Sequence, residues 1–327
     1  MPWYSVNAAI IIQSLRKHTP SVKQVWLAND SAGSGRIEPL FDWYKNLCRE
    51  GKKFGYLVNG SDTIANEAKK VFGDEVNITT DGQCHLRAII GSKEYKDQYC
   101  REKVLGWKGE IETLSEIAKS RPHAAYIAFT KGYKSKFTYF MRTIESFDDY
   151  VNPIQEAIND LLVPTLFGQS EPLPSELRQL VTLTTAQGGM GIEDLKLEAP
   201  QQFVASVSIT TAHVHSITSQ STFMTTGERS TVELKRHHQS LKTARAKERM
   251  EHIDNTLSPD LLRLVNQARD KGASSWLNAV PLVDQGLALN KQEFRDSLRL
   301  RYNLPLVGLP SQCVCGDKFT VGHALSC

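Results

Sequence analysis

From about residue 95 onward, apolar residues recur at intervals of three and four positions, and this spacing limits the possible fold more than any other feature of the chain. A period of 3.6 residues places such residues on one face of an α-helix. Three stripes show the spacing: Trp107, Ile111, Leu114 and Ala118; Phe137, Phe140, Met141 and Ile144; Ile154, Ile158, Leu161 and Leu162. Longer helices are predicted over 228–254, 259–271 and 291–302. The larger part of the chain is therefore predicted to be helical.

The first part of the chain has a different pattern. Apolar and polar residues alternate over 21–28, which predicts a strand. A turn is predicted at Asn29 and Asp30, and an amphipathic helix over 36–49. A strand, a turn, a second strand and a helix is the predicted order. Residues 1–17 are predicted to form a helix, and 54–58 and 86–90 to form strands. The fold class is therefore predicted to be α+β.

Two segments between the helices are predicted to interrupt them. Gly188, Gly189 and Gly191 indicate a turn. The Ser/Thr-rich stretch 206–226 is predicted to be the end of a helix and a flexible connection.

Composition favours a folded chain outside the membrane. Hydrophobic residues make up 40% of the 327 residues and charged residues 23%, which excludes the disordered class. The apolar stretch 8–12 is far shorter than the roughly 20 residues of a membrane helix. Six scattered cysteines lack the density of a secreted disulfide scaffold. An intracellular protein, nuclear or cytoplasmic, is expected.

Charge is distributed unevenly along the chain, although the net charge is only +3. Residues 101–144 carry nine Lys/Arg and four Asp/Glu, 145–200 carry two and ten, and 227–303 carry fourteen and ten. Two basic zones therefore flank an acidic one. Basic zones attract phosphate backbones, and solvated charged faces produce the same pattern.

The first basic zone interleaves aromatic residues with Lys131, Lys134 and Lys136, a composition suited to stacking bases while contacting phosphates. Its aromatic residues are Tyr126, Phe129, Tyr133, Phe137, Tyr139 and Phe140. The alternative is that these aromatics belong to a helix core, with the lysines outside.

The predicted helix over 228–254 carries a second candidate surface, a basic stripe in which cationic residues and one histidine recur every three or four positions. Its members are Lys235, His238, Lys242, Arg245 and Arg249. The stripe fits a nucleic-acid backbone. The alternative is a solvated face partly neutralised by Glu233, Glu248 and Glu251.

Near residue 327 the chain holds four potential ligands of one metal ion: Cys313, Cys315, His323 and Cys327. Three thiols and an imidazole within 15 positions suit a tetrahedral Zn²⁺ ion. Gly316 and Gly322 are expected to help the chain turn around it. Unligated thiols are the alternative.

The run Gln24-Val-Trp-Leu-Ala-Asn-Asp-Ser-Ala-Gly33 resembles the catalytic hairpin of reverse transcriptases, where two aspartates lie at a strand turn. The likeness extends over nearly the whole chain. It includes Trp43-Tyr-Lys-Asn-Leu47, Phe54-Gly-Tyr56, Asn59-Gly-Ser61, Ile90-Gly-Ser92, Pro122-His-Ala124, Gly188-Gly-Met-Gly-Ile192, Gly272-Ala-Ser-Ser-Trp-Leu277, Cys313-Val-Cys315 and His323-Ala-Leu-Ser-Cys327. Together these motifs resemble the C-terminal part of a polymerase from a retroelement of the non-long-terminal-repeat type.

The resemblance implies three parts. Residues 1–94 correspond to a partial palm with a degenerate catalytic hairpin, 95–304 to a mainly helical thumb and connector, and 305–327 to a short zinc-knuckle-like end with the family's cysteines and histidine. RNA and DNA are the implied partners.

The resemblance also implies a damaged catalytic site. Polymerases of this kind use two Mg²⁺ ions about 3.5–4 Å apart, held by clustered carboxylates. Asn29 stands where the first of the paired aspartates belongs and leaves Asp30 alone, and the remaining family aspartate is expected upstream of residue 1. Asp62 occupies the place of a family lysine, and Arg87 that of a glycine. The Mg²⁺ site of the family is therefore predicted to be lost.

These observations predict a polymerase-inactive fragment of a retroelement reverse transcriptase that retains binding of RNA or DNA. Two alternatives remain. One is an active RNA-directed DNA polymerase whose missing palm is supplied by another chain. The other is a decayed reading frame without a selected function.

Overall fold

The computed structural model describes most of the chain. The described residues are 15–27, 30–34, 36–50, 56–57, 62–72, 78–85, 88–219, 225–320, 322–323 and 327. They are mostly helical and include three small two-stranded sheets, so the chain is of the α+β class. None of the described helices is long and apolar enough to cross a bilayer.

The chain divides into two compact units, each built from separate stretches. Unit 1 comprises Met1–Glu102, Arg142–Glu145 and Gln201–Ser240. Unit 2 comprises Lys103–Met141, Ser146–Pro200 and Leu241–Cys327. The three-part division inferred from the resemblance stays a prediction.

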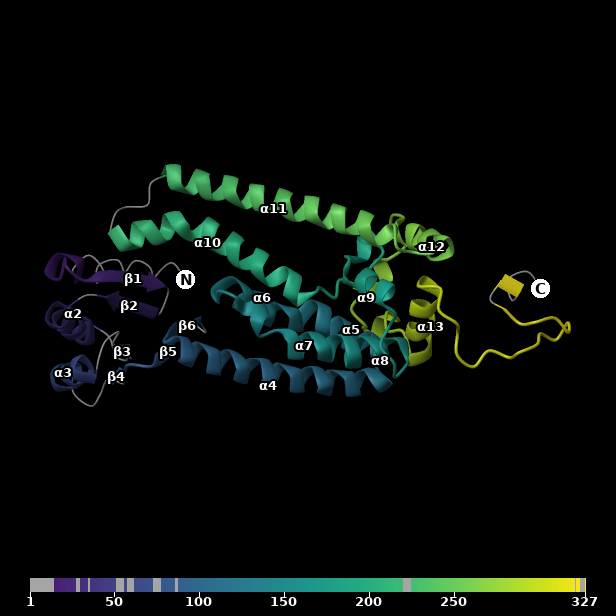
Figure 1. Ribbon diagram of the computed structural model, residues 1–327, viewed down its shortest axis with the longest axis horizontal. Coiled ribbons are helices and arrows are strands. Elements are labelled where there is room, and N and C mark those ends of the chain that lie inside the picture. Colours follow the sequence, from purple (N-terminus) through teal and green to yellow (C-terminus); the bar gives the residue numbers. More distant parts are fainter. Residues whose placement is uncertain are drawn as a thin grey trace. The chain divides into compact units, whose positions relative to one another are not determined.

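Unit 1 begins with the hairpin that the sequence predicts (Figure 1). Strands β1 (Lys23–Leu27) and β2 (Asp30–Ser34) pair antiparallel, with Leu27 opposite Asp30, and helix α2 (Ile37–Glu50) follows. The two predicted strands and the helix after them are therefore confirmed, whereas Asp30, predicted to be part of the turn, is the first residue of β2. Asn29, in the connection between the strands, lies outside the described residues.

Helix α2 holds this part of unit 1 together by burying one face. Leu40, Trp43 and Leu47 are buried with Leu15 and Val22. Helix α3 (Asp62–Phe72) packs beside it, and its Phe72 ring meets Phe41 and Tyr44 edge-on. Two further strand pairs complete the sheets: β3 (Tyr56–Leu57) with β4 (Ile78–Thr79), parallel, and β5 (Gly82–His85) with β6 (Ala88–Gly91), antiparallel.

Helices make up most of the described residues from Lys93 to Arg301. They are α4 (Lys93–Ser120), α5 (Pro122–Ile127), α6 (Lys134–Thr143), α7 (Asn152–Ala157), α8 (Val163–Phe167), α9 (Ser175–Thr182), α10 (Leu195–Ser219), α11 (Thr225–Asp254), α12 (Pro259–Arg269) and α13 (Lys291–Arg301). The π-helical turns η1 (Ala128–Tyr133) and η3 (Ile158–Leu162) join α5 to α6 and α7 to α8. The long helices predicted over 228–254, 259–271 and 291–302 are confirmed within two or three residues at each end.

The helix end predicted within 206–226 is confirmed, because α10 ends at Ser219. The helix reaches further into the Ser/Thr-rich stretch than a flexible connection would allow, and 220–224 lie outside the described residues. Polar side chains fit into this helix because their hydroxyls bond to its own backbone. Thr210 donates to Ser206 O at 2.8 Å and Thr211 to Val207 O at 2.7 Å, one turn earlier.

The core of unit 2 contains an aromatic cluster. Phe137, Phe140 and Phe147 surround Trp107, with ring centroids 4.7–6.4 Å from the indole and edge-on geometry. These rings are all buried. Such pairs add about 0.5–1.5 kcal/mol each beyond area burial.

A glycine turn, formed by residues 188–192, lies in the core of unit 2 among several helices. Gly188 and Gly191 have φ values of +89° and +67°, a region that favours glycine. The turn's carbonyls are satisfied by buried side chains: the Tyr302 hydroxyl donates to Gly188 O at 3.1 Å and the Tyr126 hydroxyl to Met190 O at 2.7 Å. Gly188-Gly-Met-Gly-Ile192 is thus a packed structural turn.

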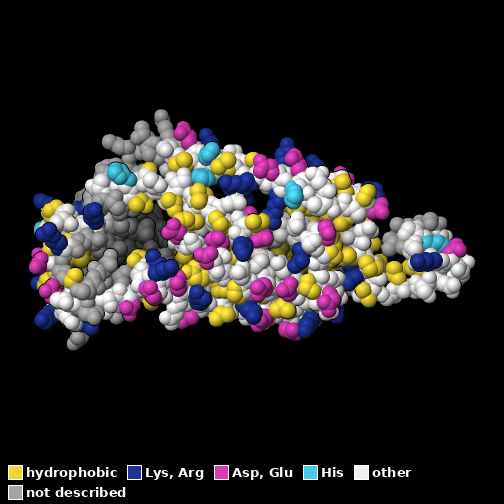
Figure 2. Space-filling view, viewed as in Figure 1, with side chains coloured by type: hydrophobic (Ala, Val, Ile, Leu, Met, Phe, Trp, Pro, Cys, Tyr) yellow, Lys and Arg dark blue, Asp and Glu magenta, His cyan; other side chains and the backbone are white. Residues whose placement is uncertain are grey.

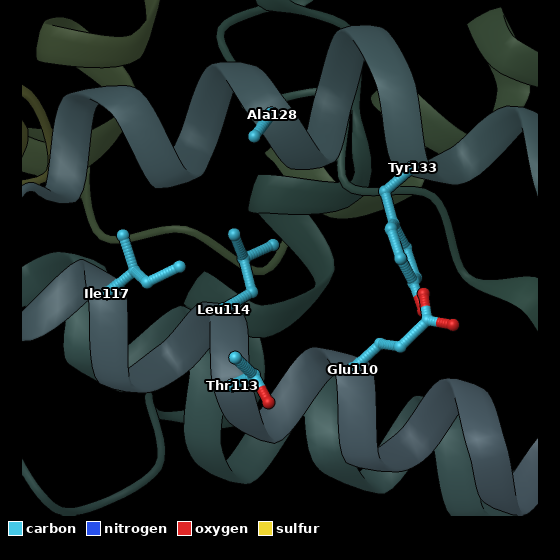
Figure 3. A pocket seen from close by; sticks show the side chains of 6 residues that line it. All are labelled: Glu110, Thr113, Leu114, Ile117, Ala128 and Tyr133. Carbon is cyan, nitrogen blue, oxygen red and sulfur yellow. The ribbon is translucent and has the colours of Figure 1, made fainter.

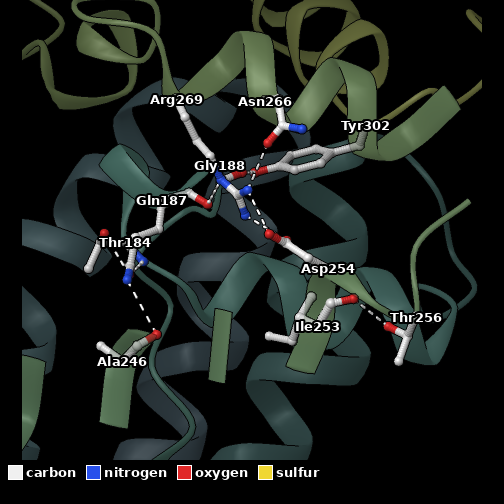
Figure 4. A network of polar contacts seen from close by, with 10 residues as sticks. All are labelled: Thr184, Gln187, Gly188, Ala246, Ile253, Asp254, Thr256, Asn266, Arg269 and Tyr302. Atoms are coloured by element: carbon white, nitrogen blue, oxygen red, sulfur yellow. Dashed lines mark hydrogen bonds and ion pairs between the residues drawn. The ribbon is translucent and has the colours of Figure 1, made fainter. Parts of the chain in front are cut away.

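An ion pair fastens α11 to α12 beside this turn (Figure 4). Arg269 donates from both terminal nitrogens to the Asp254 carboxylate at 2.7 and 2.8 Å, and from Nε to Gln187 O at 3.0 Å. Both side chains are about four-fifths buried, at 18% and 22% exposure. The bidentate geometry makes this a stronger contact than an exposed pair.

Helix α13 contributes arginines that cap other helices. Arg295 donates to the carbonyls of Ala118 and Thr165, and Arg299 donates to those of Phe167 (2.9 Å) and Pro305 (2.7 Å). Ala118 lies in the last turn of α4, and the other two helical acceptors are in α8. Because the last carbonyls of a helix lack intrahelical partners, the contacts to Ala118 and Phe167 satisfy such groups, while Thr165 O also accepts from Gly168 N–H at 3.1 Å.

His123 is a buried titratable group of unit 2, exposed by only 2%. Its Nδ1 accepts a hydrogen bond from the Leu289 N–H at 3.2 Å, and its ring stacks on Phe294 at 5.2 Å. Burial lowers the pKa of His123, and a backbone hydrogen bond with Ala279 opposes this only in part. The neutral imidazole is therefore the form that the fold favours.

The stability of the chain is accordingly expected to fall as pH falls. The folded pKa lies below the unfolded value of about 6.5, so the unfolded state binds the proton first. The contribution of neutral His123 to the free energy of unfolding is complete above about pH 6.5. It is lost as pH decreases toward the folded pKa, by at most about 1.4 kcal/mol per pH unit. Urea unfolding between pH 5 and 7.5 measures this slope. H123Q is expected to flatten the slope and H237Q, at an exposed site, to leave it unchanged; equal slopes in all three proteins would disprove the assignment.

Candidate metal centre

The structure brings the four predicted metal ligands into one cluster. One ligand atom from each of Cys313, Cys315, His323 and Cys327 lies within 4.8 Å of the others. Cys313 Sγ and Cys327 Sγ are 3.9 Å apart, and Cys315 Sγ and His323 Nε2 are 3.1 Å apart. With Zn–S bonds of about 2.3 Å, two sulfurs of a tetrahedral site are roughly 3.8 Å apart. The S···S distance already fits a bound zinc ion, and the S···N distance needs to open by less than about 0.5 Å.

A short hairpin presents the first two ligands. Cys313 N–H donates to Asp317 O at 2.8 Å and Gly316 N–H to Cys313 O at 2.9 Å, and Gln312 bridges to Lys318 across the turn. Gly316 has a φ of +94°, so the glycine is required there. The predicted need for Gly322 finds less support, because a Cβ at that position would meet only Thr320 Oγ1, at 3.9 Å.

Two hydrogen bonds from main-chain N–H groups position the other two ligands. The Thr320 hydroxyl accepts from His323 N–H at 3.0 Å, and Cys327 N–H donates to His323 O at 2.8 Å. The second bond joins the two ligand residues directly. The hairpin and this bond therefore bring a Cys-x-Cys pair and a His/Cys pair together.

The electrostatics of the cluster differ between its thiols. Hydrogen bonding from the Cys315 backbone, aided by the thiols of Cys315 and Cys327, holds the pKa of the Cys313 thiol below its ordinary value. The pKa of Cys327 is raised, chiefly through its contact with the Cys315 side chain. Zn²⁺ binds thiolates. Cys313 is thus the thiol of this pair that deprotonates more readily.

The purified chain is expected to bind one Zn²⁺ ion. The change C315S should weaken binding by more than about 100-fold, because even the loss of a group behind the ligands weakens metal sites 10–100-fold. C84S is the matched control, since Cys84 is an exposed free cysteine outside the cluster. Zinc transfer to a chromogenic chelator measures the affinity, and equal affinities of the two variants would remove Cys315 from the site.

The lysines of the first basic zone already have partners in unit 2. Lys134 pairs with Glu193 at 3.6 Å, and Lys136 Nζ lies 2.5 Å from Glu110 Oε2. Lys131 donates to the Asn278 side-chain carbonyl at 3.3 Å. All three therefore serve the packing of this unit as well as its surface charge.

The aromatic residues of that zone form core rather than a stacking surface. Tyr126, Phe129, Phe137 and Phe140 are buried, and only Tyr139 is exposed, by 36%. Of the two alternatives for these aromatics, the helix core is the one that the structure supports, because Phe137 and Phe140 pack against Trp107 and Tyr126 bonds to the glycine turn.

The basic stripe on α11 lies toward the packed side of that helix. Thr231 and Ile253 are buried, and both fall on the same helical face as Arg249, which is half-buried. Lys235, Lys242 and Arg245 are exposed, and Lys242 Nζ lies 4.0 Å from Glu198 Oε2. Long cationic side chains can pack their stems while their charged ends reach water. The charged ends of three of the four cations thus remain accessible.

On the face seen in Figure 2, basic and acidic side chains are interspersed over the helices. A broad surface of one sign does not appear on that face. The stripe is thus a local cationic feature of α11.

A pocket between α4 and the α5–η1 segment was not predicted (Figure 3). It has a volume of about 260 Å³ and is lined by Glu110, Thr113, Leu114, Ile117, Ala128 and Tyr133. Burial would raise the pKa of Glu110, but hydrogen bonds from Lys136 and Tyr133 lower it on balance. Glu110 is therefore an anchored carboxylate, and spacing alone held no signal of this arrangement.

The side chains of the predicted catalytic residues lie outside the described part of the chain. Asn29 is outside the described residues, and only the backbone of Asp30 is described, in β2. Among the residues that the structure describes, the C-terminal quartet is the one group of three or more Cys, His, Asp or Glu placed to hold a metal ion. Nothing in it supports the family's Mg²⁺ site. Compared with known proteins, the chain matches no family model, no curated protein and no solved structure.

Proposed function

We propose that this chain is a polymerase-inactive fragment of a retroelement reverse transcriptase that binds RNA or DNA and carries a zinc-binding C-terminal segment. The observation that carries the proposal is the convergence of Cys313, Cys315, His323 and Cys327 within 4.8 Å. These are the residues that the motif resemblance selects as ligands. A chance set of thiols would have no reason to converge on one histidine, with one sulfur pair at the spacing of a tetrahedral zinc site.

The zinc-binding segment supports nucleic-acid binding through its size and rigidity. Residues 311–327 have few buried side chains. Such a short segment requires a metal ion to hold one conformation, because it cannot bury enough apolar surface. Zinc knuckles are among the modules that recognise single-stranded RNA.

The hairpin residues support the loss of polymerase activity. In-line transfer of a nucleotide requires two metal ions held by several carboxylates. The connection between β1 and β2 supplies Asn29 and Asp30, one neutral amide and one carboxylate. An amide oxygen adds no negative charge, so it cannot offset a second divalent cation.

The accessible cations of α11 are the proposed phosphate contacts. Lys235, Lys242 and Arg245 recur at intervals of seven and three residues on one helical face. Each phosphate contact releases a bound counterion, so affinity falls with salt concentration. The proposed surface therefore recognises the nucleic-acid backbone and reads little sequence.

Binding of a labelled RNA or DNA hairpin is expected to weaken steeply with salt. The triple variant K235Q/K242Q/R245Q should reduce the slope of log affinity against log salt by about 3, one unit per phosphate contact. The charge-matched control R263Q/K271Q/K291Q changes exposed cations of α12, α13 and the segment between them. Fluorescence anisotropy over a salt series measures both slopes.

The outcomes separate the proposal from its alternatives. Salt-dependent binding that the α11 variant reduces and the control variant does not, without primer extension in Mg²⁺, supports the proposal. Primer extension by the same preparation would restore the polymerase. Absence of both activities would leave a decayed reading frame, and equal loss in the two triple variants would move the contact surface away from α11.

A further inference from the structure

We propose that the metal cluster is also a thiol redox switch, in which Cys313 and Cys327 join in a disulfide that releases the metal ion. This inference rests on the zinc site of the proposed function. It adds a modification site and names the pair of atoms that reacts.

The distances select this pair among the three thiols. Cys313 Sγ and Cys327 Sγ are neighbours at 3.9 Å. The third thiol has further partners besides these two cysteines: Cys315 Sγ lies 3.1 Å from His323 Nε2 and 3.8 Å from the Asp317 carboxylate. A disulfide between Cys313 and Cys315 would close a ring across only one intervening residue, and such a small ring would strain the disulfide.

The pair is open to an oxidant. Cys327 is exposed and Cys313 is partly exposed, whereas Cys100, in α4, is buried. The sulfurs of Cys313 and Cys327 are 3.9 Å apart, so an approach of about 2 Å brings them to a disulfide bond length.

A hydroperoxide is the oxidant class that balances the reaction. The thiolate of one cysteine attacks a peroxide oxygen, the O–O bond breaks, and a sulfenic acid and one molecule of water or alcohol result. The second thiolate attacks the sulfenic sulfur, the S–S bond forms, and the S–O bond breaks with release of water. Two thiols are oxidised by two electrons, and one hydroperoxide is reduced.

The disulfide removes two of four metal ligands. Cys315 and His323 remain, and a zinc ion bound by two protein ligands is held far more weakly. Loss of a single outer partner already costs 10–100-fold in affinity, so oxidation is expected to weaken zinc binding by more than about 100-fold. A thiol reductant is expected to restore it.

The experiment uses the full chain freed of metal. It is treated with hydrogen peroxide, its remaining thiols are alkylated, and non-reduced peptides are identified by mass spectrometry. A Cys313–Cys327 link with alkylated Cys315 is the expected result, and prior addition of Zn²⁺ is expected to prevent it. C315S should still form the link, and C327S should abolish it.

Zinc titration of the same samples separates the two proposals. If the reduced chain binds no zinc but the Cys313–Cys327 link forms, the zinc site of the proposed function is disproved. The disulfide pairing is then supported, but the metal-releasing switch is disproved. If zinc binds and peroxide produces another pair, or sulfinic acids without a link, the inference is overturned. If the linked chain binds zinc as tightly as the reduced chain, it is overturned as well.

Discussion

G189A is expected to destabilise the chain by more than about 3 kcal/mol. A Cβ on Gly189 would lie 2.1 Å from Leu183 O, 2.5 Å from Leu183 C and 2.6 Å from Leu180 O. These are backbone atoms at the end of α9 and just beyond it, so no side chain can rotate away. The turn would have to move, and the hydrogen bonds from Tyr126 and Tyr302 to its carbonyls would be strained.

G191A is the matched control, because it adds the same methyl group two residues away. Gly191 has a φ of +67°, and a Cβ there would meet nothing within 4 Å. Only backbone strain of about 1–2 kcal/mol is expected. Urea unfolding followed by far-ultraviolet circular dichroism compares the two variants. If G189A is as stable as G191A, the predicted steric conflict between a Cβ at residue 189 and the backbone at the end of α9 is disproved.

R299A is expected to cost about 2–4 kcal/mol. Arg299 is only 7% exposed, and its guanidinium donates to Phe167 O and Pro305 O. Alanine would leave both carbonyls without this donor and would open space beside α8. R299K should recover only part of the loss, because one ammonium group does not reproduce the planar spacing of Nε and Nη1.

The control for Arg299 is an arginine at an exposed site of the same unit. R263A removes a cation from the surface of α12, and a loss below about 0.5 kcal/mol is expected. Both variants are measured by urea unfolding in the same buffer. Similar losses at the two positions would show that charge, and not the capping of α8, explains the contribution of Arg299.

Helices were predictable wherever their own stripe of apolar residues determined them. Trp107, Ile111 and Leu114 indicate α4 without reference to any other element, and the hairpin before α2 follows from alternation and its turn residues. Where α10 ends within the Ser/Thr-rich stretch was not predictable, because serine and threonine disfavour helices locally. Their hydroxyls bond to the preceding turn, which spacing statistics do not show.

The metal ligands were predictable because all four lie within 15 residues and the chemistry of zinc restricts their kinds. The two alternatives for the aromatic zone could not be separated from the sequence, for the opposite reason. Whether Phe137 and Phe140 face water or core depends on Trp107 and Phe147, which lie on other segments. Likewise, the arginine caps of α13 depend on carbonyls more than 100 residues earlier, and no local pattern marks a carbonyl as an acceptor.

The arginine caps have a consequence for how unit 2 forms during synthesis. Arg295 bonds to Ala118 across 177 residues, and His123 receives its bond from Leu289 across 166. Contacts between residues so far apart in sequence cannot form until α13 has been synthesised. They also slow folding, because long loops must close first. Nascent chains that end before residue 291 are therefore expected to expose the ends of α4 and α8, and to be preferred substrates of chaperones and proteases.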